Sequence, residues 1–98
     1  MFSKSHIQSL YPIGSVVKLK GSPKSVMIIG FCQTDAEHPE NDYDYLGVLY
    51  PEGFVGSGSQ FFFNADAIES VVFEGYQSDE LNVLKERIAA FFESKAAE

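Results

Sequence analysis

Cysteine and long apolar runs are what this chain of 98 residues most clearly lacks. Cys32 is its single cysteine, which excludes an intramolecular disulfide and the cross-links that hold many small secreted domains together. The first ten residues lack the apolar stretch of a signal peptide, and no segment approaches the ~20 apolar residues of a membrane span. We therefore expect a soluble, cytoplasmic protein without an export leader of its own.

Basic residues are also scarce, because 7 Lys and Arg stand against 14 Asp and Glu, giving a formal net charge of −7. The lysines are frequent before residue 25, whereas the first acid is Asp35. Binding to nucleic acid or to anionic membranes depends on basic side chains that displace counterions. We therefore expect no nucleic-acid partner and no membrane insertion.

Apolar residues are plentiful, at 45% of the chain, and turn residues interrupt them at short intervals. The second apolar run, residues 25–32, is apolar at both parities, which predicts a central strand covered on both sides. A polar loop of about ten residues follows it, and residues 65–68 leave room for one helical turn with Asn64 as its N-cap. In total, β-branched and aromatic runs predict five strands, at residues 15–20, 25–32, 43–50, 60–63 and 70–74.

The last segment changes to a helical period, with Ser78 as a candidate N-cap and two acids at the positive end of the helix dipole. The order of elements predicts a mainly β (α+β) fold, a five-stranded SH3-like small barrel with one short helical turn and a C-terminal amphipathic helix. We divide this single domain into an N-terminal arm (1–12), an SH3-like β domain (13–76) and the helix (78–95). The apolar face of the helix comprises Leu81, Leu84, Ile88, Phe91 and Phe92.

No pattern of residues predicts an enzyme. His6 and His38 fall in the arm and the loop, so neither is placed beside Cys32, which is more simply a small core residue. The acids of residues 35–44 do not follow the calcium-loop spacing. The glycines of residues 53–58 are not followed by a helix, as a phosphate-binding loop requires. We predict a protein without catalytic residues, metal or cofactor.

Two segments are candidates for binding a partner protein. The first is the acidic loop, a docking surface for a basic partner, with candidate residues Asp35, Glu37, Glu40 and Asp42. The second is the helix, because four turns span roughly 25 Å, more than a small barrel can cover. We expect its distal aromatic pair to be covered by a second copy or by a helical partner. The candidate contacts on this helix are Leu84, Ile88, Phe91 and Phe92.

Six short motifs, in their order along the chain, resemble a family of small proteins. The family is a domain of unknown function encoded in Gram-positive type VII secretion gene clusters, near polymorphic toxins that carry LXG targeting domains. It has no established catalytic residues to carry over. The motifs are Tyr11-Pro12-Ile13-Gly14-Ser15-Val16-Val17, Met27-Ile28-Ile29-Gly30, Tyr43-Asp44-Tyr45, Tyr50-Pro51-Glu52-Gly53, Phe62-Phe63-Asn64 and Val71-Val72-Phe73-Glu74-Gly75-Tyr76.

The resemblance implies a cytoplasmic chaperone or targeting factor for a type VII secreted LXG toxin. Its partner would be the helical LXG region of the toxin, with other small helical targeting proteins as further partners. The alternative is an immunity protein that neutralises a toxin's catalytic domain, which an acidic surface suits if that domain is a basic nuclease. Binding to the N-terminal or to the C-terminal half of the toxin separates the two functions.

Overall fold

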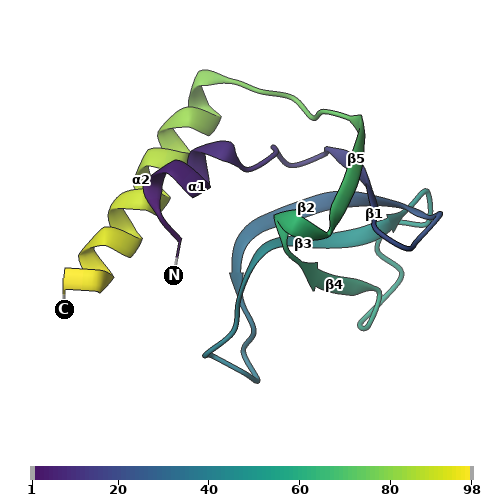
Figure 1. Ribbon diagram of the computed structural model, residues 1–98, viewed down its shortest axis with the longest axis horizontal. Helices are drawn as coiled ribbons and strands as arrows, with labels where there is room; N and C mark the ends of the chain where they lie inside the picture. The colour runs from purple at the N-terminus through teal and green to yellow at the C-terminus, as the bar shows by residue number, and fades with distance from the viewer. Residues whose placement is uncertain (1, 98) are drawn as a thin grey trace. The chain divides into compact units, whose positions relative to one another are not determined.

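A computed structural model describes residues 2–97, in which five strands form one antiparallel sheet (Figure 1). Two compact units divide the chain: the sheet unit, Tyr11–Tyr76, and a helical unit that contains the first and last helices. The elements are α1 (Lys4–Ser9), β1 (Val16–Leu19), β2 (Ser25–Thr34), β3 (Asp42–Tyr50), β4 (Gln60–Phe63), the 3-10 turn η1 (Ala65–Ala67), β5 (Ile68–Phe73) and α2 (Asp79–Ala97).

The strand order of the sheet is β4-β3-β2-β1-β5, and every neighbouring pair is antiparallel. The predictions of five strands, of a central second strand and of a helical turn before the fifth strand are therefore confirmed. The prediction that the second strand is covered on both sides is wrong, because β2 buries Val26, Ile28 and Phe31 and leaves the residues between them half-buried. Closure into a barrel is not observed, because β4 and β5 are the two edges of the sheet among the described residues. The fold is an open antiparallel sheet with a C-terminal helix.

Buried residues on one face of the sheet follow the alternation of the strands. Cross-strand pairing places Val17 of β1 opposite Val26 of β2, and both are buried. Further along, Tyr45 of β3 is opposite Phe63 of β4, and their rings lie 5.2 Å apart. A Cβ on Gly47 would lie 2.8 Å from side-chain atoms of both Val26 and Phe63. Glycine at position 47 therefore lets the core close at this point.

The strands β2 and β3 are long and visibly curved (Figure 1). Their register shifts between Ile28 and Gly30, which marks a β-bulge and increases the local bend. Both strands also run further than the pattern of turn residues predicts, since β2 continues to Thr34 and β3 begins at Asp42. The loop between them is therefore shorter than the predicted stretch 33–42.

Side-chain hydrogen bonds connect segments of the sheet unit that are far apart in the sequence. The Tyr45 hydroxyl accepts from the Tyr11 N–H at 2.9 Å, and the buried Ser15 Oγ accepts from the Gly75 N–H at 2.9 Å. The Asp44 carboxylate accepts from the Ala65 N–H at 2.7 Å. Asn64 stands at the predicted N-cap position, but its Oδ1 accepts from the Asp44 N–H instead. Asp44 therefore caps the turn η1, in place of Asn64.

The helical unit contains a helix, α1, in the segment assigned to an N-terminal arm. Ser3 caps α1 by accepting from the His6 N–H at 3.2 Å. α1 packs with α2, and the Lys85 Nζ donates to the carbonyl oxygens of Gln8 at 3.2 Å and Leu10 at 2.7 Å. This cation satisfies carbonyl groups at the end of α1 that the helix itself leaves unpaired.

Candidate partner-binding surfaces

The strand β5 exposes nearly all of its side chains. Ile68 is half-buried, and every residue from Glu69 to Phe73 is exposed, including Val72 and Phe73 at 57% and 61%. β-branched and aromatic residues favour strands, which explains why this segment pairs with β1. Exposed apolar side chains that lie together on a small protein mark a contact surface.

A hollow of about 340 Å³ lies beside these side chains. The register aligns Phe73 with Val16 and Val16 with Met27, so these three lie in one row across three strands. Half-exposed Tyr50, at the end of β3, completes the apolar lining. We call the five side chains Val16, Met27, Tyr50, Val72 and Phe73 the β5 surface.

A second hollow of about 420 Å³ lies in the β3–β4 connection, among Leu49, Val55 and Phe61. Glu52 also borders it, and its carboxylate lies 2.7 Å from the Lys24 Nζ. This hydrogen bond with Lys24 holds the pKa of Glu52 below its usual value. The ion pair joins the β1–β2 turn to the β3–β4 connection.

The candidate residues on α2 divide into two pairs. Ile88 and Phe92 are half-buried, and the Phe92 ring packs edge-on against Phe2 at 5.1 Å. Leu84 and Phe91 are exposed, at 45% and 56%. Of these four residues, Phe92 therefore packs within the helical unit, whereas Leu84 and Phe91 are open to solvent.

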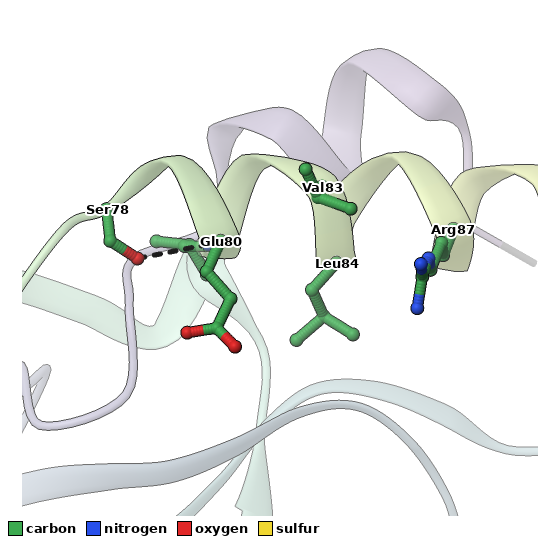
Figure 2. Close-up of a pocket in the computed structure, with 6 residues that line it drawn as sticks. Ser78, Glu80, Val83, Leu84 and Arg87 are labelled. Atoms are coloured by element: carbon green, nitrogen blue, oxygen red, sulfur yellow. Dashed lines mark hydrogen bonds between the residues drawn. The ribbon is translucent and has the colours of Figure 1, made fainter.

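Leu84 borders a hollow along α2 of about 460 Å³. Figure 2 shows Glu80, Leu84 and Arg87 projecting from the same side of the helix, so an apolar side chain stands between an acid and a base. Ser78 begins this helix as predicted, since its Oγ accepts from the Leu81 N–H at 3.1 Å. We call the exposed side chains Leu84 and Phe91 the α2 stripe.

The acidic loop candidates do not form one cluster of free carboxylates. Asp35 caps its own loop by accepting from the Glu37 N–H at 3.0 Å, and Asp42 accepts from the Thr34 hydroxyl at 2.8 Å. Glu37 and Glu40 are exposed, with the Glu40 carboxylate 3.5 Å from the His38 Nδ1. Two of the four acids thus shape the loop, and two remain available to a basic partner.

The described residues contain no group of three or more His, Cys, Asp and Glu that could hold a metal ion. Nor is any helix within residues 2–97 both long and apolar enough to cross a bilayer. Burial raises the pKa of Tyr45 to about 12, but its hydroxyl is engaged by the Tyr11 backbone in the core. The pKa shift of Tyr45 therefore has a structural cause.

The β5 surface was missed by reasoning from the sequence, although its residues were predicted to form strands. A signal was present in Val71, Val72 and Phe73, because three consecutive apolar residues cannot all face the core of a half-buried strand. α1 also had a signal, in Ser3 as a cap and Ile7 with Leu10 at helical spacing.

The chain is thus a small α+β protein with an open antiparallel sheet and apolar surfaces on both of its units. It belongs to the family described as a domain of unknown function (DUF4176), whose model matches residues 10–84. Neither the curated proteins nor the solved structures gave a match. The matched range contains the whole β5 surface, whereas the α2 stripe is divided, because Phe91 lies beyond it.

Proposed function

We propose that this protein is a non-enzymatic binding factor, and that it serves as a cytoplasmic chaperone or targeting factor for a type VII secreted LXG toxin. The observation that carries the binding role is the β5 surface. Five apolar side chains from four strands line one hollow there, and Tyr50, Val72 and Phe73 are exposed. Leaving aromatic and aliphatic groups in water is unfavourable, and a partner protein that covers them recovers that free energy.

The fold of the sheet supports the same proposal. The order β5-β1-β2-β3-β4, with a 3-10 turn between β4 and β5, is the order expected of an SH3-like small barrel opened along one side. We include this narrower fold assignment in the proposal. Small barrels of this kind commonly bind peptide segments in grooves lined by aromatic residues.

The toxin as partner is supported by the motifs along Tyr11–Tyr76, which resemble proteins encoded beside LXG toxins. The matched family covers the same part of the chain. The net charge of −7 supports a partner whose contact surface is neutral or basic.

Co-purification with a co-encoded toxin tests the proposal. The full chain, tagged, is expressed with either the N-terminal LXG half or the C-terminal catalytic half of the toxin. We expect capture of the N-terminal half alone. Capture of the catalytic half alone identifies an immunity protein instead, and capture of neither half rejects the toxin as partner.

A further inference from the structure

The outer edge of β5 is a row of backbone groups without a strand beside it. Among the described residues, β5 is the last strand of the sheet and pairs with β1 on one side. The outward N–H and C=O groups of an edge strand are bound by water or by an added strand. Only an extended chain can bind these groups in series, since the backbone groups of a helix are already paired.

The two edges of the sheet differ in their side chains. β4 spans Gln60–Phe63, and its aromatic residues are half-buried or buried. β5 is longer, and it exposes Val71, Val72 and Phe73. Natural proteins usually protect a sheet edge with charges, bulges or short strands, because an apolar edge recruits other chains. β5 has a bulge and the acid Glu69, but its last three residues still expose apolar side chains. The apolar edge of β5 is thus the one suited to binding.

A bulge aims two of these side chains at the same hollow. Val16 pairs with Phe73 and Val17 pairs with Val71, so Val72 is an extra residue on β5. A bulge re-aims side chains in this way, and both Val72 and Phe73 line the hollow of the β5 surface. A strand added beside Phe73 would place its own side chains next to this hollow, within the reach of cross-strand contacts.

We propose that the edge of β5 binds an extended segment of a partner protein as a sixth strand of the sheet. The segment carries apolar residues at alternate positions, which pack on Val72 and Phe73 at the hollow. Polar or neutral residues lie between them, because both signs of charge lie near this edge: Glu69 is exposed on β5, and Lys18 of β1 pairs with Ser70. The net charge of −7 disfavours a second copy as occupant, because two copies of this charge repel each other. The inference deepens the proposed binding function.

A displayed library of random linear peptides, about twelve residues long, is the probe for this proposal. Panning on the full chain is expected to recover peptides with apolar residues at alternate positions. A synthetic copy of a recovered peptide should slow amide exchange in β5. The same peptide with alternate residues N-methylated should bind at least about tenfold more weakly, because methylation removes the donors that pair with the edge.

Two phenylalanines provide a matched pair of variants, since Phe73 and Phe54 are each 61% exposed. Phe73→Ser should weaken peptide binding at least about tenfold, as expected for a central aromatic contact. Phe54→Ser changes the same amount of apolar surface elsewhere, and should leave affinity within about twofold. Recovery of no peptide, of peptides with helical spacing, or of peptides indifferent to N-methylation overturns the proposal.

Capture of the toxin tests the proposed function, whereas binding of the peptide tests the proposed strand site, so the two proposals can fail separately. If the LXG half is captured equally by the wild-type chain and by Phe73→Ser, the proposed function stands and the β5 edge is not its site. If the peptides bind at β5 and neither toxin half is captured, the edge binds a strand and the toxin is not its source.

Discussion

Tyr45 is a buried ionisable residue whose protonation should affect stability at high pH. Burial raises its pKa from 10.0 to about 12. Below pH 10 the hydroxyl is neutral in both the folded and unfolded states. Between pH 10 and 12 the unfolded chain loses this proton while the folded chain retains it, so the unfolded state binds fewer protons. The free energy of unfolding therefore falls as pH rises through this window.

Tyr45→Phe should remove that part of the pH dependence. At neutral pH the variant loses about 1 kcal/mol, because the Tyr11 N–H loses its acceptor. From pH 10 to 12 the wild-type chain should lose up to about 3 kcal/mol more stability than the variant does. Urea unfolding of both chains at several pH values measures this. Parallel pH profiles for the two chains would contradict the assignment.

Gly75 is a position where the backbone of another segment leaves no room for a side chain. A Cβ there would collide with the Ile13 carbonyl oxygen and lie 2.9 Å from the Ser15 backbone nitrogen. Gly75→Ala should therefore reduce the free energy of unfolding by about 1–3 kcal/mol. Thermal or urea unfolding of the wild-type chain and of Gly75→Ala measures this difference in the free energy of unfolding.

Gly30→Ala is the control for that variant. The added Cβ would meet the amide end of the Gln33 side chain at 3.1 Å, and a flexible side chain can move away. Its cost should be smaller than that of Gly75→Ala. Equal losses in the two variants would show that the close backbone approach at Gly75 is not what matters.

At the level of elements, α1 is held by a lysine from the other helix of its unit. Lys85 is buried and donates to the Gln8 and Leu10 carbonyl oxygens. Lys85→Met keeps the aliphatic length but removes the donors, so α1 should lose about 1.5–3 kcal/mol of stabilisation. The loss of α1 amide protection in hydrogen exchange measures the effect.

Lys95→Met serves as the matched variant, because Lys95 is exposed on the same helix. It removes an equal charge, and it should leave the protection of α1 unchanged. If both variants release α1 to the same extent, the net charge of α2 rather than the contact with Leu10 accounts for the result.

The strands could be predicted because turn residues and alternation are local signals. Gly21, Pro51 and Gly75 bound strands within a few residues of the observed ends. The long apolar runs of β2 and β3 indicated strands because the composition of a run is also a local signal. The sheet order and the openness of the sheet depend on long-range pairing, which no local pattern encodes.

The covered face of α2 could not be predicted from apolar residues alone. The most buried side chains of this helix are Lys85 and Ala89, so the packed face is centred beside the predicted stripe. A lysine such as Lys85 was expected in solvent. Lys85 is buried because it binds the Leu10 carbonyl oxygen at the end of α1, which lies far away in the sequence. Asp44 was treated as a loop acid for the same reason, since its partner Ala65 is supplied by another segment.

For the molecule as a whole, two units suggest two groups of amides in native-state hydrogen exchange. The α1 and α2 amides should exchange together, because Phe2 and Phe92 pack across this pair of helices. Phe2→Ser should therefore accelerate exchange in α2 as well as in α1. Amide exchange in the sheet unit should stay as it is in the wild-type chain. A uniform acceleration of exchange over residues 2–97 would instead indicate one cooperative unit.

The helical unit is assembled from segments on either side of the sheet unit in the chain. On the ribosome, α1 is synthesised first and α2 only after the whole sheet. The buried side chains Ile7 and Leu10 therefore emerge long before the helix that packs with α1. Local strand contacts can form during this interval. Until α2 is available, α1 is a short helix of only marginal stability. Nascent chains that carry residues 1–78 followed by a linker long enough to span the ribosomal exit tunnel should thus hold a folded sheet and an unprotected first segment.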